Sequence, residues 1–181
     1  VTPRQTCLTS GMALGVTLSA PDLDKANYEE SYLLAKINVA LGGRVAEELV
    51  YGTITTGAES DIEQLTGIAR AMVGRWGMSS KIGPIAVTPV DGRGPFLPGA
   101  AEVSPQTQEL IDEEVRRIVD QAHEEVAALL KENRDKLDSL AAALLEHETL
   151  DQEDAYAAAH VEKRAENSTG AELAAAARTA S

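Results

Sequence analysis

The stretch PQTQELIDEEVRRIVDQAHEEVAALL, residues 105–130, repeats its apolar side chains at steps of three and four residues. This spacing places them on one face of an α-helix. The stripe consists of Leu110, Ile111, Val115, Ile118, Val119, Ala122, Val126, Leu129 and Leu130, with acids and arginines opposite. Pro105 suits the first turn of the helix, with Ser104 as its N-cap. The stretch therefore predicts a long amphipathic helix whose carboxylates, the run Asp112-Glu113-Glu114 included, face solvent.

The residues that follow predict two more helices and a tail. Residues 133–146 keep the helical spacing, with Leu137, Leu140, Ala141, Leu144 and Leu145 facing inward. With the long helix they form a C-terminal helical hairpin. Thr149 and Gln152 match a capping box and predict a short third helix. Residues 165–181 are mostly Ala, Ser, Thr, Glu and Gly, so we expect a disordered low-complexity tail after one domain at 1–164.

Upstream of the long helix, two further segments have helical spacing. The first spans residues 24–51 and is interrupted by Gly42 and Gly43, which either break the helix or let another element approach its backbone closely. The second begins near Ser60, which with Glu63 matches a capping box, and its apolar positions run through Trp76. Gly77 suits the C′ position after this helix.

The remaining segments are rich in turn-forming and β-branched residues. Residues 78–104 hold many Gly and Pro, with Ile85–Thr88 as a short strand. Residues 1–21 are rich in Thr, Ser and Gly and predict a strand pair, with Val16–Leu18 as one strand. The expected fold is mainly α, with a small N-terminal β-hairpin and a C-terminal helical hairpin.

Composition excludes several classes of function. The 29 acidic and 16 basic residues leave a formal charge of −13, which disfavours nucleic acid and anionic membrane surfaces as partners. The single cysteine, Cys7, cannot form an internal disulfide. No stretch approaches the ~20 apolar residues of a membrane span, so we expect a soluble chain without membrane contact.

Few residues offer catalytic chemistry by pattern. His123, His147 and His160 are expected at the surface, because each lies in a predicted acidic, solvated helical region. No two of them have the i, i+4 spacing of a zinc helix. A Gly-x-Ser-x-Gly elbow and a P-loop are also absent from the sequence, so no catalytic residue is assigned. Asp61 would lie in the first turn of a helix, near the positive end of its dipole.

Glu47 and Glu48 follow the glycine pair on a largely apolar helix. One is expected to face solvent and the other to pair with Arg44 or Arg70.

A series of motifs in one order resembles the peptidase domain of FtsH-type proteases. The series begins with Gly42-Gly43-Arg44-Val45-Ala46-Glu47-Glu48-Leu49 and Thr55-Thr56-Gly57-Ala58-Glu59-Ser60-Asp61-Ile62-Glu63. It continues with Ala69-Arg70-Ala71-Met72-Val73, Trp76-Gly77-Met78-Ser79, Ile82-Gly83-Pro84, Ile111-Asp112-Glu113-Glu114-Val115 and Glu148-Thr149-Leu150. The resemblance covers about residues 11–155.

The resemblance implies a membrane-anchored, ATP-dependent zinc metalloendopeptidase of protein quality control, a hydrolase built as a homo-hexamer on the cytoplasmic face of the plasma membrane. Its substrates are proteins and peptides, and ATP and Mg belong to its ATPase domain. Two zinc ligands come from a His-Glu-x-x-His helix, whose glutamate is the general base, and Asp61 matches the third. The resemblance gives Gly42 and Gly43 the role of packing beside the zinc helix. It makes Glu47 or Glu48 a runner-up that orients a zinc-bound histidine.

The sequence departs from the family in two ways. The residues 1–181 hold neither the His-Glu-x-x-His motif nor an ATPase module, so we expect this fragment to be inactive alone. Gln5–Ser10 intervene where relatives have a glycine directly after Pro3-Arg4, which leaves the hairpin geometry and the role of Cys7 open. The alternative is a non-catalytic helical module for oligomerisation or interaction, derived from that family.

Overall fold

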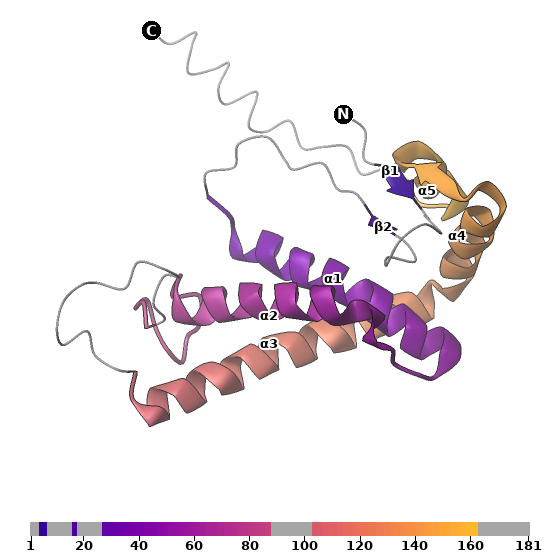
Figure 1. The fold of residues 1–181 in the computed structure, drawn as a ribbon. Coiled ribbons are helices and arrows are strands. Elements are labelled where there is room, and N and C mark those ends of the chain that lie inside the picture. Colours follow the sequence, from indigo (N-terminus) through magenta and orange to yellow (C-terminus); the bar gives the residue numbers. More distant parts are fainter. Residues whose placement is uncertain (1–3, 7–15, 18–26, 88–102, 163–181) are drawn as a thin grey trace, which may run out of the picture. The chain divides into compact units, whose positions relative to one another are not determined.

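The computed structural model describes residues 4–6, 16–17, 27–87 and 103–162 (Figure 1). The chain divides into two compact units. One comprises residues 22–134, and the other combines residues 1–21 with 135–181. Each unit is described by itself, and the predicted tail at 165–181 lies outside the described residues.

Three helices build the larger unit: α1 (Glu30–Tyr51), α2 (Glu59–Gly74) and α3 (Pro105–Glu132), with a short 3-10 helix, η1 (Thr56–Ala58), before α2. Each helix packs on the other two (Figure 1). Their shared core is aliphatic and excludes water, which is the main stabilising contribution to such a unit. It is made of Leu33, Ile37, Ala40, Leu41, Val45, Leu65, Ala69, Met72, Val73, Ile111, Val115, Ile118, Ala122 and Val126.

The smaller unit holds a three-stranded antiparallel sheet of order β2-β1-β3, formed by β2 (Val16–Thr17), β1 (Arg4–Thr6) and β3 (Thr149–Asp151). It also contains α5 (Gln152–Ala158) and α4 (Arg134–His147), whose first residue belongs to the larger unit. The predicted N-terminal strand pair and the mainly α class are confirmed. The third strand was not predicted. Because α3 and α4 fall in different units, the C-terminal hairpin itself stays a prediction.

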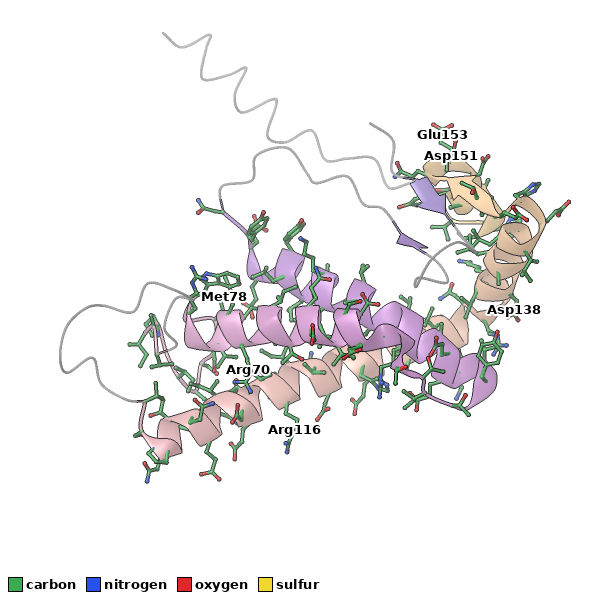
Figure 2. All side chains as sticks on the ribbon, viewed as in Figure 1. Arg70, Met78, Arg116, Asp138, Asp151 and Glu153 are labelled. Atoms are coloured by element: carbon green, nitrogen blue, oxygen red, sulfur yellow. The ribbon has the colours of Figure 1, made fainter. Side chains whose placement is uncertain are left out.

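One helix begins with the predicted cap, and two do not. Ser104 caps α3 by accepting a hydrogen bond from Thr107 N at 3.2 Å, with Pro105 in the first turn. Ser60 is not a cap, because α2 begins at Glu59. Thr149 is not a cap either, because it lies in β3. Asp151, labelled in Figure 2, caps α5 by accepting a hydrogen bond from Asp154 N at 3.0 Å.

Gly77 lies one residue beyond its predicted C′ position, because Arg75 is the C-cap of α2, and it adopts φ +66°. A Cβ at this position would lie 2.7 Å from Pro84 Cα, so only glycine fits the close approach of the 83–84 backbone.

Several apolar side chains predicted to face inward are exposed. Trp76 is 44% exposed because α2 ends at Gly74, before the helical spacing does. Leu110 and Leu129 are exposed at the two ends of α3, and Ala141 and Leu145 are exposed on α4. The predicted strand at Ile85–Thr88 is absent over residues 85–87. There Val87 N donates instead to Gly74 O at 2.7 Å.

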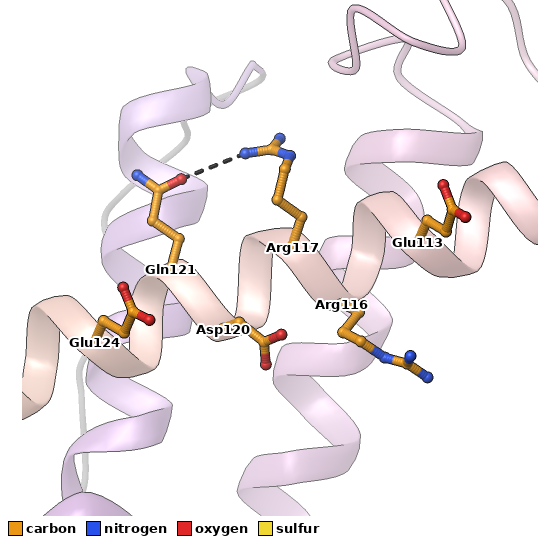
Figure 3. Close-up of a pocket in the computed structure, with 6 residues that line it drawn as sticks. All are labelled: Glu113, Arg116, Arg117, Asp120, Gln121 and Glu124. Atoms are coloured by element: carbon orange, nitrogen blue, oxygen red, sulfur yellow. Dashed lines mark hydrogen bonds between the residues drawn. The ribbon is translucent and has the colours of Figure 1, made fainter.

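The expectation that Glu114 faces solvent is wrong, since this residue is only 1% exposed. Its carboxylate accepts from Ser79 Oγ at 2.9 Å, and Lys81 Nζ lies 3.1 Å away. Arg117 donates through Nε at 3.1 Å and through a terminal nitrogen at 3.3 Å. Figure 3 shows the solvent side of α3, where Arg117 also bonds Gln121. Glu114 therefore ties residues 79–81 to α3.

These partners shift the acidity of Glu114. The hydrogen bonds from Arg117, with further ones from Lys81 and Ser79, outweigh burial and lower the pKa of Glu114 from 4.5 to about 2. A carboxylate with a lowered pKa stabilises the fold fully above its unfolded pKa, and this contribution fades as pH falls toward the folded value.

We predict that Glu114→Gln lowers the free energy of unfolding by about 1–3 kcal/mol at pH 7, because Ser79 and both cations lose their anionic partner. Chemical denaturation measures the change, with Glu113→Gln at the exposed neighbouring position as the control, expected within about 0.5 kcal/mol of wild type. The difference in free energy of unfolding between wild type and Glu114→Gln should become smaller as the pH falls from 4.5 to about 2. A gap that stays constant over this range contradicts the assignment.

Candidate metal centre

Asp61 is the third residue of α2 and is half-buried. Glu59 and Asp61 are the acidic residues of this first turn, where the unpaired N–H groups and the helix dipole favour a negative charge. Among the described residues, none forms a hydrogen bond or an ion pair with the Asp61 carboxylate. Its oxygens are therefore available to coordinate a metal ion.

The turn that leads into Asp61 is fixed from α1. Thr55 is the N-cap of η1, and its hydroxyl accepts from Gly57 N at 3.2 Å. The same hydroxyl donates to Glu47 Oε2 at 3.0 Å. Thr55 was predicted only as part of the family motif and not as a cap, although a Thr two residues before a glycine in a turn is a signal for such a side-chain-to-backbone bond.

The two adjacent glutamates of α1 have different partners. Glu47 is half-buried and bonds Thr55, whereas exposed Glu48 lies 3.3 Å from His123 Nε2 on α3. The predicted pairing with Arg44 or Arg70 is wrong. Arg70, labelled in Figure 2, instead pairs with Asp112 at 2.9 Å because α2 and α3 lie side by side.

The helix α1 runs unbroken through Gly42 and Gly43, so the helix-break alternative is wrong. No heavy atom of the described neighbourhood lies within 4 Å of a Cβ built at either glycine. Val39, Gly43, Ala46 and Val50 are spaced by four, three and four residues and share one face of α1. We call these four residues the open face of α1. Val39 is 79% exposed, and the face carries no charge.

The described part of the chain does not hold a complete metal site. No group of three or more His, Cys, Asp and Glu side chains converges among the described residues. His147 and His160 are exposed as predicted, His123 is half-buried beside Glu48, and Cys7 lies outside the described residues. A protein zinc site needs at least three ligands, so Asp61 alone fits one position of it.

A hollow along α3 offers no alternative metal centre. It is lined by Glu113, Arg116, Arg117, Asp120, Gln121 and Glu124, all from one helix (Figure 3). These side chains include three acids, two arginines and a glutamine, and all are exposed, as expected for a solvated helix face.

Comparison with known proteins identifies the family. The family model of Peptidase family M41 matches residues 3–157. The chain belongs to peptidase family M41. It is 70% identical over 152 residues to the ATP-dependent zinc metalloprotease FtsH 3 of Conexibacter woesei, covering 84% of this chain and 20% of that protein. It is 52% identical over 157 residues to the ATP-dependent zinc metalloprotease FtsH of Syntrophus aciditrophicus, covering 83% and 21%.

This M41 chain thus spans about a fifth of the length of the curated relatives it matches. The match confirms the resemblance to FtsH-type peptidases. The relatives are named zinc metalloproteases, and the partial coverage is consistent with a fragment of such a protein.

We predict that Gly43→Ala raises the free energy of unfolding of this chain by about 0.5–1 kcal/mol, because alanine favours the helix and meets no neighbour on the open face. Thermal or urea unfolding measures this change in the free energy of unfolding. Gly77→Ala is the opposing control and should destabilise by more than about 1 kcal/mol, because of its φ of +66° and its contact with Pro84. A loss of stability with Gly43→Ala would show that the open face is covered within this chain.

Proposed function

We propose that this chain is part of the peptidase domain of an ATP-dependent zinc metalloendopeptidase, in which Asp61 is the third protein ligand of the zinc ion. The observation that carries the proposal is the half-buried Asp61 carboxylate at the start of α2, in the turn that holds the family motif, with no partner among the described residues. The two histidine ligands and the glutamate base would come from a His-Glu-x-x-His helix outside residues 1–181.

In the complete enzyme, zinc would supply the Lewis acid and the activated water that cleave a peptide bond. The residues of this chain would bind and orient. Asp61 would contribute one oxygen ligand from the first turn of α2. The core shared by α1 and α2 would hold this ligand against the helix that carries the open face.

The open face of α1 is the proposed seat of the missing zinc helix. Gly43 and Ala46 present almost bare backbone between Val39 and Val50, which allows close approach of a second helix. The resemblance to FtsH-type peptidases supports this seat, because it gives the glycine pair the role of packing beside the zinc helix.

The full-length assembly follows from the same proposal. Its substrates would be proteins, and its subunits would form a homo-hexamer at the cytoplasmic face of the membrane, with ATP and Mg bound to the ATPase module. None of the helices in the described ranges has the length and apolar character of a membrane span. Alone, the fragment is expected to be inactive, since it lacks two ligands and the general base.

We predict that Asp61→Ala in the complete enzyme abolishes stoichiometric zinc and proteolysis, because two histidines leave the ion under-coordinated. Zinc content by mass spectrometry and degradation of an unfolded protein measure the two effects. Asp120→Ala, an exposed carboxylate of α3, is the control and should retain both.

The fragment provides a second arm of this test. Calorimetric titration of residues 1–181 with zinc should show no tight one-to-one site, with or without Asp61. Tight binding by the fragment, or full zinc content in the Asp61→Ala enzyme, contradicts the proposal.

We further predict that Gly43→Leu lowers zinc content in the complete enzyme while the isolated fragment stays folded, since the side chain occupies the seat of the zinc helix. Gly67→Leu on α2, where a Cβ also meets no described atom within 4 Å, is the matched control. Equal zinc content in the two variants would show that the zinc helix does not pack on the open face of α1.

A further inference from the structure

We propose that Glu47 is a positioning residue for Asp61 and acts through Thr55. In this view Glu47 fixes the hydroxyl of Thr55, Thr55 fixes the amide of Gly57, and the turn so formed sets where α2 begins. The inference rests on the proposed function of Asp61 as a zinc ligand, but the relay itself is measurable without metal.

The direction of each hydrogen bond in the relay is determined by chemistry. An ionised carboxylate only accepts, so the Thr55 hydroxyl donates its proton to Glu47 Oε2, at 3.0 Å. A lone pair of the Thr55 hydroxyl oxygen accepts a hydrogen bond from Gly57 N, at 3.2 Å. The bond to the carboxylate is charge-assisted and is the stronger of the two, so it restricts the rotamer of Thr55.

The relay leads directly to the proposed ligand. Gly57 is the middle residue of η1, which ends at Ala58, and α2 starts at the next residue. Ala58 is the N-cap of α2 and makes no side-chain cap hydrogen bond. The Thr55 hydroxyl is therefore the side-chain cap that this corner has, and Asp61 follows Gly57 by four residues.

Gly57 leaves room for the relay. A Cβ at this position would lie 3.3 Å from Thr55 Oγ1 and 3.9 Å from Glu47 Oε1. A side chain there would press on the hydroxyl that links α1 to the turn. Both carboxylate oxygens of Glu47 thus face the turn that precedes α2.

Glu48 shows that the relay is specific to one of two adjacent carboxylates. It lies one residue along α1, and its Oε2 is 3.3 Å from His123 on α3. Glu48→Gln therefore changes charge at the same height of α1 without touching the turn, which makes it the matched control for the relay.

The first experiment uses the fragment and measures hydrogen exchange of the Gly57 amide by NMR. Thr55→Val removes the acceptor and should speed exchange by about 3- to 10-fold, the factor that corresponds to one net hydrogen bond. Glu47→Ala should act in the same direction, while Glu47→Gln and Thr55→Ser, which keep acceptor and hydroxyl, should stay near wild type. Glu48→Gln should leave the rate unchanged. An unchanged rate in Glu47→Ala overturns the relay.

The second experiment measures the zinc dissociation constant of the complete enzyme. Glu47→Ala and Thr55→Val should each weaken zinc binding by up to about 10-fold, the lower end of the range for losing a direct hydrogen-bond partner of a metal ligand, because both act on Asp61 only through the turn. The double variant should bind zinc as tightly as the single variant of lower affinity does, because both changes break the same relay. Glu47→Gln and Thr55→Ser should restore affinity. Additive losses would contradict the relay and indicate that Glu47 acts on a zinc-bound histidine.

Failure of this inference is distinguishable from failure of the proposed function. If Asp61→Ala keeps zinc, Asp61 is not a ligand, whatever the Gly57 amide shows. If Asp61→Ala loses zinc while Glu47→Ala binds it as wild type does, Asp61 remains the ligand and only the positioning role of Glu47 is overturned.

Discussion

The aliphatic seam where α1, α2 and α3 meet is the constraint on which the other features of the larger unit depend. Ile37, Ala69 and Val73 are fully buried in it, one from α1 and two from α2. Close packing at such positions leaves little freedom in how two helices slide or rotate against one another. It therefore fixes the height at which the end of α1 faces the start of α2, and the polar contacts at both ends of α2 follow from that alignment.

Two carboxylates use this alignment differently. Glu114 is buried, and its partners come from the segment after α2 and from α3 itself, so it closes the unit at one end of α2. Glu47 is half-buried and reaches the turn before α2, at the other end. Each holds a non-helical segment against a helix that hydrophobic packing has already placed. A directional bond is needed there, because burial of apolar area has no preferred direction.

Much of this arrangement was predictable from local patterns, and the errors have a common origin. The helices follow apolar spacing, and Ser104 is a cap with no competitor nearby. Ser60 and Thr149 fit a capping box equally well, yet neither is a cap. Thr55 caps the 3-10 helix η1 before α2, and Asp151 caps α5, because the turn and strand before these helices are set by other elements. Glu114 falls between Ile111 and Ile118 on the buried stripe of α3, and that spacing was the available signal.

The amino-acid order by itself determined the helical class, the family and Asp61 as the residue expected to bind metal, since these rest on periodicity and on motifs contiguous in the chain. Only the tertiary structure decided that Glu47 contacts Thr55, that Glu48 contacts His123 and that Glu114 meets Ser79 and Lys81. Glu47 and Thr55 are 8 residues apart, Glu48 and His123 are 75 apart, and Glu114 and Ser79 are 35 apart. A side chain's partner depends on how the helices pack, and that is a property of the assembled core.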